Sequence, residues 1–122
     1  MIEASKLPRA FKTAWFNKAA KKALIRDEEL CKAIHEVILG QADDLGGGVF
    51  KKRLKDNRYR SLILTKSAEY WIYEFLFAKS DRDNIDAAEL QAFRSLAKSY
   101  ASLSSKQVKA LIDDHHFYEL IL

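Results

Sequence analysis

The sequence predicts an α+β fold. It combines a small, mostly antiparallel sheet, made of an N-terminal strand plus a three-stranded meander, with an N-terminal helical pair and C-terminal helices. Three β-type runs follow one another between residues 49 and 82, helix-forming segments rich in Ala and Lys precede them, and two helix-capping motifs come after them. A length of 122 residues fits one domain, so we expect residues 1–122 to fold as a single unit.

The composition is that of a globular protein with a basic surface. Hydrophobic residues make up 48% of the chain and charged residues 31%, which argues against a disordered chain. The formal net charge is +4 and the pI is near 9.2. This charge points to a polyanion or an acidic protein as partner, although a basic surface with no special partner fits the charge alone equally well.

Cysteine usage and hydropathy indicate a cytoplasmic protein. The single cysteine, Cys31, excludes an internal disulfide and is typical of a reducing compartment. The first ten residues, M-I-E-A-S-K-L-P-R-A, contain no continuous apolar segment of the signal-peptide type. The longest apolar run, Tyr70 to Ala78, is interrupted by Glu74 and is much shorter than the roughly 20 residues that span a bilayer. We therefore expect no membrane contact.

A strand and two helices are predicted before the meander. The strand, Ala10 to Phe16, mixes β-branched and aromatic residues after Pro8. Asn17 is the predicted N-cap of a first helix and Asp27 that of a second helix, which Gly40 ends. The apolar residues of the second helix follow the spacing i, i+4, i+7 and i+8, as Leu30, Ile34, Val37 and Ile38.

The meander begins after a glycine-rich loop. The three glycines that end the loop, Gly46–Gly48, match no phosphate-binding motif and no helix follows them, so we interpret them as a flexible entry to a strand. Side chains alternate along the first strand: Val49, Lys51 and Arg53 share one face, and Phe50, Lys52 and Leu54 share the other, with Phe50 and Leu54 in the core.

The second and third strands follow at short intervals. A hairpin loop, Lys55–Arg58, connects the first strand to the second, Tyr59 to Lys66, and brings Arg60 close to the first strand. The third strand, Tyr70 to Lys79, is apolar on both faces, which predicts a central position in the sheet.

Two capping boxes specify the C-terminal helices. Asp86 and Glu89 form the first, with Ile85 and Leu90 as the hydrophobic staple. Ser104 and Gln107 form the second, before a final helix from about Ser105 to Asp114. The apolar stripe of the first of these helices consists of Leu90, Phe93, Leu96, Ala97 and Tyr100.

Motifs for metal and hydrolase chemistry are absent. The chain has no H-E-x-x-H, no paired cysteines and no G-x-S-x-G. Cys31 and His35 lie one helical turn apart, but a metal site needs further ligands, and a core cysteine beside a surface histidine is the favoured interpretation. We expect no metal and no cofactor.

Two other sets of polar residues match functional patterns poorly. The aspartates Asp81, Asp83 and Asp86 fail the calcium-loop template, because Ile85 stands at the third ligand position. His115 and His116 could act in acid/base catalysis, but adjacent positions on a helix face different ways.

The cations of the meander are the better candidates. Lys51 and Arg53 share a face, the hairpin brings Arg60 within reach, and Lys79 and Arg82 close the third strand. Arginine binds phosphate through two hydrogen bonds and stabilises a charged transition state, so such a group suits phosphodiester chemistry. A solvated basic sheet face is the alternative.

The order and spacing of these pieces resemble the RelE-like toxins of type II toxin-antitoxin systems, in the RelE/ParE superfamily. The telling segments are L-G-G-G-V-F-K-K-R-L, the pair Tyr59-Arg60, and F-A-K-S-D-R-D-N-I-D leading into a helix. The resemblance covers residues from about Phe11 to Leu96 and leaves a C-terminal helical extension from about Ala97.

The resemblance implies a toxin that cuts mRNA in the ribosomal A site, without metal, by attack of the RNA 2′-OH on the adjacent phosphate. Lys51 and Arg53 stand where the RelE branch has two alternating lysines, Arg60 matches the arginine that would hold the scissile phosphate, and Lys79 matches a basic residue that closes the last strand. The implied partners are the ribosome, mRNA and an antitoxin, commonly a helix-turn-helix protein.

The pattern departs from the family at two positions. Ser80 follows Lys79 where the branch has an arginine, with Arg82 two positions on, and Asp86 replaces its base-stacking tyrosine. The general acid, the general base and the base-recognition contact therefore stay unassigned. A ParE-like inhibitor that binds gyrase and a non-catalytic RNA-binding module are the alternative functions.

Overall fold

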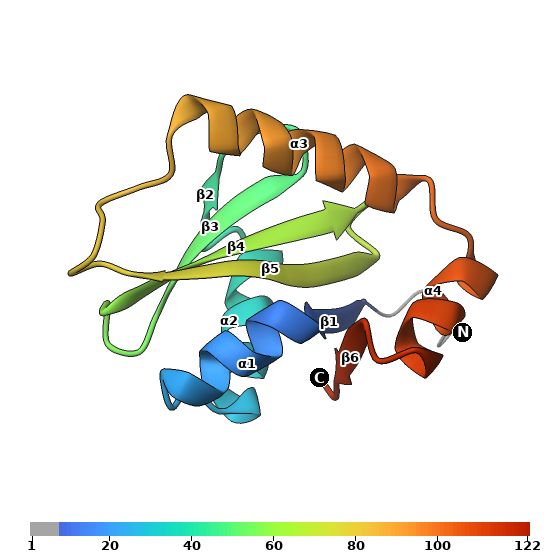
Figure 1. Cartoon of the computed structure of the whole chain (residues 1–122), viewed down its shortest axis with the longest axis horizontal. Coiled ribbons are helices and arrows are strands. Elements are labelled where there is room, and N and C mark those ends of the chain that lie inside the picture. Colours follow the sequence, from blue (N-terminus) through green and yellow to red (C-terminus); the bar gives the residue numbers. More distant parts are fainter. Residues whose placement is uncertain (1–7) are drawn as a thin grey trace.

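A computed structural model describes residues 8–122 and confirms the α+β fold. The elements are β1 (Arg9–Thr13), α1 (Ala14–Lys22), α2 (Asp27–Ile38), β2 (Asp43–Asp44), β3 (Val49–Leu54), β4 (Tyr59–Lys66), β5 (Tyr70–Ala78), α3 (Ala87–Ala101), α4 (Ser105–Asp113) and β6 (Phe117–Leu120). The six strands of the described chain form one sheet in the order β2-β3-β4-β5-β1-β6. Helix α3 lies along one face of the sheet, and helices α1 and α2 lie on the opposite side (Figure 1).

The first strand ends earlier than predicted. The strand to Phe16 and the cap at Asn17 are both wrong, because β1 stops at Thr13 and Trp15 and Phe16 belong to the first turn of α1. The Thr13 hydroxyl accepts a hydrogen bond from the Phe16 backbone N–H at 3.1 Å, so Thr13 caps the helix. The Phe16 side chain is then buried against Tyr73, with ring centroids 4.8 Å apart.

The second helix lies where it was predicted, but its N-cap is a different residue. Arg26 is the N-cap residue and makes no side-chain capping bond, so the predicted cap at Asp27 is wrong. Asp27 lies in the first helical turn, where its carboxylate accepts a hydrogen bond from the buried Lys12 ammonium at 2.7 Å. Gly40 follows the helix with φ +87°, the left-handed conformation that ends many helices and that glycine adopts without strain.

The meander has the predicted order. Strands β3, β4 and β5 pair antiparallel in series, while β1 pairs parallel with β5, which places β5 inside the sheet as predicted. Phe50 and Leu54 pack into the core beneath α1 and α2. Lys52, on the same face, reaches Glu36 at 3.1 Å and the Gln41 carbonyl at 2.8 Å, which neutralises it at the margin of this core.

A β-bulge changes which face the end of β5 presents. Tyr73 lies opposite Ile63, and Phe75 lies opposite Leu62, so Glu74 is an extra residue between two consecutive partners on β4. Without the bulge, Phe75 and Phe77 would share the face of Tyr73 by simple alternation. With it, Phe77 lies opposite Arg60 and Phe75 opposite Leu62, on the face that carries Lys51 and Arg53.

The C-terminal segment contains two capped helices and an unpredicted strand. Both capping boxes, Asp86 with Glu89 and Ser104 with Gln107, are confirmed. After α4 the chain turns at His115, which has φ +59°, so His115 and His116 lie between a helix and a strand rather than on a helix. Strand β6 then pairs antiparallel with β1 at the end of the sheet.

No helix within residues 8–122 is both long and apolar enough to cross a bilayer. The expectation that the first residues contain no signal-type apolar segment concerns residues 1–7 and lies almost wholly outside the described chain.

Candidate functional site

Three neighbouring strands place basic and aromatic side chains on one face of the sheet. Arg53 of β3 lies directly opposite Arg60 of β4, and Arg60 lies directly opposite Phe77 of β5. Residues that face each other in this way point to the same side, with Cβ atoms about 5 Å apart. Lys51 lies two residues from Arg53 along β3 and therefore shares the face. We call Lys51, Arg53, Arg60 and Arg82 the cation cluster.

Arg60 is the buried member of the cation cluster. Its residue is only 7% exposed, and its Nη1 donates hydrogen bonds to the Asn57 carbonyl at 2.9 Å and the Tyr59 carbonyl at 3.3 Å. These bonds fix the guanidinium to the hairpin that connects β3 and β4. No carboxylate within residues 8–122 forms an ion pair with Arg60. A buried charge without a counter-ion is costly, so the position favours binding of an anion from outside.

The loop between β5 and α3 connects two other cations. Asn84 accepts a hydrogen bond from Lys51 Nζ through its side-chain oxygen at 3.5 Å, and from Arg82 Nε through its backbone carbonyl at 3.0 Å. The Arg82 guanidinium also lies 5.6 Å from the centre of the Phe77 ring. This loop therefore brings Arg82 to the surface that Arg60 and Phe77 form.

Lys51 and Arg82 each form an ion pair with a carboxylate of the same chain. Lys51 Nζ lies 3.9 Å from Asp43 Oδ2. Arg82 forms a two-bond ion pair with Glu89, one bond of which measures 3.0 Å, and this arginine lowers the pKa of the Glu89 carboxyl below its ordinary value. In the free protein Arg82 is thus occupied, and a phosphate would have to compete with Glu89 for it.

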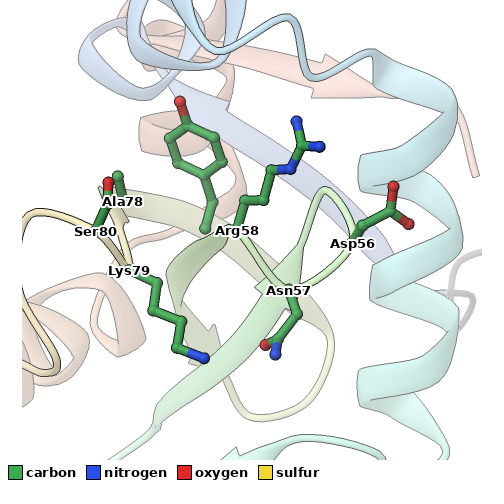
Figure 2. A pocket seen from close by; sticks show the side chains of 7 residues that line it. Asp56, Asn57, Arg58, Ala78, Lys79 and Ser80 are labelled. Atoms are coloured by element: carbon green, nitrogen blue, oxygen red, sulfur yellow. The ribbon is translucent and has the colours of Figure 1, made fainter.

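Lys79 lies at a hollow beside the hairpin that connects β3 and β4. The hollow has a volume of about 600 Å³ and is lined by Asp56–Tyr59 and Ala78–Ser80. The Lys79 backbone N–H donates to the Arg58 carbonyl at 2.8 Å, which joins the end of β5 to the hairpin. Figure 2 shows the side chains of Lys79 and Asn57 pointing to one side and that of Arg58 to the other. Lys79 itself is exposed.

A second hollow, of about 320 Å³, adjoins the cation cluster. Its lining consists of Gln41, Ala42, Asp43, Lys51, Lys52 and Arg53. Two cations of the cluster therefore border open space beside β3, and the exposed Arg53 side chain is accessible to a ligand there.

The remaining polar candidates lie elsewhere. Cys31 is partly exposed and its Sγ donates to the Ile121 carbonyl at 3.3 Å, and burial raises the pKa of its thiol. No group of three or more His, Cys, Asp or Glu side chains within the described chain is arranged to hold a metal ion. His115 packs beside Tyr118 of β6, and three strands separate β6 from β3.

Sequence reasoning missed three residues of this surface. The sequence predicts Phe77 only as part of an apolar strand, and the bulge at Glu74 that orients it has no clear sequence signal. Asn84 has no sequence feature that marks its contacts with Lys51 and Arg82. Arg58, a predicted turn residue, lines the hollow beside Lys79.

The arrangement can bind a phosphodiester. Arg53 and Arg60 lie side by side, present several N–H donors and form no ion pair with any carboxylate of the described chain. Such donors suit the oxygens of a phosphate.

Comparison with known proteins gives a family match. A family model described as the RelE toxin of the RelE/RelB toxin-antitoxin system matches residues 8–120. No curated protein matches the chain.

Proposed function

The chain belongs to the RelE family of toxins of toxin-antitoxin systems, and from this premise we propose that it is a ribosome-dependent mRNA endonuclease that inhibits translation. Family membership implies an antitoxin as partner. The nuclease activity, the ribosome and mRNA as its partners, and the residues that act belong to the proposal.

One observation carries the proposal: a buried arginine, Arg60, that lies beside Arg53 and has no carboxylate partner in the described chain. In the proposed reaction the RNA 2′-OH attacks the adjacent phosphorus, the bond to the 5′-oxygen breaks, and a cyclic phosphate and a 5′-hydroxyl form. Arg53 and Arg60 hold the phosphate and stabilise its extra negative charge. Lys51 contacts the same group from β3.

Two further cations have supporting roles. Arg82 releases the Glu89 carboxylate and binds the phosphate backbone of the RNA instead. Lys79 contacts a neighbouring nucleotide at the hollow beside the hairpin. The attacking 2′-OH gives its proton to water and the leaving 5′-oxygen takes a proton from water, so the cations contribute charge stabilisation only.

The partner that neutralises the toxin follows from the same surface. We propose a helix-turn-helix antitoxin whose acidic segment covers the cation cluster, because a basic surface attracts an acidic chain as it attracts RNA. Covering Arg53 and Arg60 would block the phosphate site directly.

Induction of the toxin in growing cells tests the function. We expect primer extension on cellular mRNA to show cuts in phase with codons, and only while translation proceeds. Arg60→Ala and Lys51→Ala should each reduce cutting by about 100-fold or more, the effect of removing one donor to a transition-state oxyanion. Lys109→Ala, an exposed change on α4 that removes the same charge, should leave cutting unchanged.

Two results would contradict the proposal. Cuts that persist when translation is blocked would exclude dependence on the ribosome. Full growth inhibition by Arg60→Ala and Lys51→Ala would exclude a phosphate role for these cations and would favour the ParE-like, gyrase-binding alternative.

A further inference from the structure

Trp15 is an aromatic residue with an exposed ring at the start of α1. Its residue is 52% exposed, whereas the other tryptophan, Trp71, is 5% exposed. One face of the indole stacks on Phe75 of β5, with ring centroids 5.2 Å apart and planes at 19°. Phe93 of α3 supports Phe75 with a centroid distance of 5.6 Å. The indole is thus held in place while half of its surface stays open to water.

The stacked pair continues into the cation cluster. The Phe75 and Phe77 centroids are 6.1 Å apart, and the Arg82 guanidinium lies 5.6 Å from the Phe77 ring. Arg60 lies opposite Phe77 in the register of β4 and β5. Trp15, Phe75 and Phe77 therefore form a row, which we call the aromatic row, that begins at an exposed indole and ends at two arginines.

An exposed ring joined to phosphate-binding cations fits single-stranded RNA. Nucleic-acid bases stack on aromatic side chains without regard to sequence, and cations beside the ring bind the backbone. A purely apolar ligand would have no use for the arginines at the end of the row.

We propose that Trp15 is the base-stacking residue of this toxin. A base of the mRNA near the bound phosphate stacks on the open face of the indole, and Arg53 and Arg60 hold that phosphate. The inference rests on the proposed function, because it assigns a nucleotide contact to the same RNA site.

Tryptophan fluorescence measures the contact directly. We expect titration of a single-stranded hexaribonucleotide to quench the fluorescence of the wild-type protein, and Trp15→Phe to abolish the quenching because only the buried Trp71 remains. In Trp15→Ala, affinity for the labelled oligomer should fall about tenfold or more, the effect of losing one base-aromatic stack. Trp15→Phe should retain most of the affinity, since phenylalanine also stacks.

Two comparisons separate stacking from other effects. Leu39→Ala, at another exposed apolar residue, the C-cap of α2, should leave RNA binding unchanged. The slope of log Kd against log salt concentration should stay the same in Trp15→Ala and become shallower in Arg60→Ala, because only the arginine neutralises a phosphate. Thermal unfolding of each variant checks that it folds.

The inference and the proposed function fail in different ways. Unchanged RNA affinity in Trp15→Ala, or no quenching of the wild type at any RNA concentration, overturns the inference. If Trp15→Ala keeps its RNA affinity but escapes neutralisation by the antitoxin, the row is a protein-docking surface and the inference is also overturned. Parental cutting by Arg60→Ala overturns the function whatever Trp15 does.

Discussion

Two arginines of one surface are held in different ways. Arg60 donates to backbone carbonyls of its own hairpin, whereas Arg82 pairs with the Glu89 carboxylate. The first contact fixes the guanidinium and leaves its charge uncompensated. The second compensates the charge, so Arg82 can contribute to RNA binding only in exchange for Glu89.

Local sequence predicted part of this arrangement. Alternation along β3 and a short hairpin sufficed to place Arg53 beside Arg60, and the register confirms that they are neighbours. The pairing of Arg82 with Glu89 depends on the path of the loop from β5 to α3. Along that path Asn84 contacts Lys51 and Arg82, and no local pattern specifies these contacts.

Replacing Glu89 with Gln should strengthen RNA binding. The amide keeps an oxygen that can accept the capping-box hydrogen bond from the Asp86 N–H, but it no longer neutralises Arg82. We expect severalfold tighter binding of a single-stranded oligoribonucleotide at low salt. The slope of log Kd against log salt should steepen by up to about 0.7 for the added phosphate contact.

Glu28→Gln provides the matched control. It removes the same charge from an exposed position in the first turn of α2 and should leave the slope as it is in the wild type. An equal slope in Glu89→Gln and the wild type would show that Arg82 makes no contact with RNA.

At the scale of elements, the bulge in β5 decides which aromatic rings reach the cation cluster. Strand and helix identities were largely predictable, since the capping boxes and the period-two pattern are local signals. A bulge depends on how two strands pair, and its extra residue, Glu74, looks like an ordinary polar interruption in the sequence. The faces of Phe75 and Phe77 could therefore not be predicted.

Glu74 also makes the stability of the fold depend on pH. Burial raises the pKa of its carboxyl above the ordinary 4.5, and this effect exceeds the opposing hydrogen bond from the Tyr100 hydroxyl. A carboxyl with a raised pKa in the folded state stabilises the fold below its ordinary pKa, and this contribution is lost as the pH rises through the raised value. Glu74→Gln keeps an acceptor for Tyr100 and cannot ionise.

Urea unfolding of the wild type and Glu74→Gln at pH 4 and pH 7 tests this. We expect similar midpoints at pH 4 and a higher midpoint for Glu74→Gln at pH 7. Glu69→Gln, an exposed change in the turn between β4 and β5, controls for the loss of one carboxylate. A midpoint for Glu74→Gln that falls below that of the wild type at pH 7 would mean that the ionised carboxylate stabilises the fold.

At the scale of the whole molecule, the two ends of the chain meet in one sheet. Strand β1 pairs parallel with β5 and antiparallel with β6, so residues near both ends complete the sheet beyond the meander. These pairings join segments far apart in the sequence. Strand β6 has four residues, too few for a periodic pattern, which is why the sequence predicted only helices for this segment.

Phe117 is the residue through which β6 stabilises the fold. Its residue is 4% exposed, and its ring lies 5.5 Å from that of Phe11 and 5.6 Å from that of Tyr100. It therefore joins β6 to β1 and to α3 in one aromatic cluster. Because α3 also packs on the strands that carry Lys51 and Arg60, loosening this cluster reaches the proposed active face.

Phe117→Ala should destabilise the protein strongly. Removing a buried phenylalanine ring costs about 3–5 kcal/mol, which lowers the Tm of a domain of this size by about 10 °C or more. Ile121→Ala changes a neighbouring residue that is 91% exposed and should shift stability by no more than about 0.5 kcal/mol. Thermal and urea unfolding of both variants measure the difference. Equal stability of the two variants would show that β6 packs on the fold only loosely, and that the chain before Phe117 is sufficient to hold α3 over the sheet.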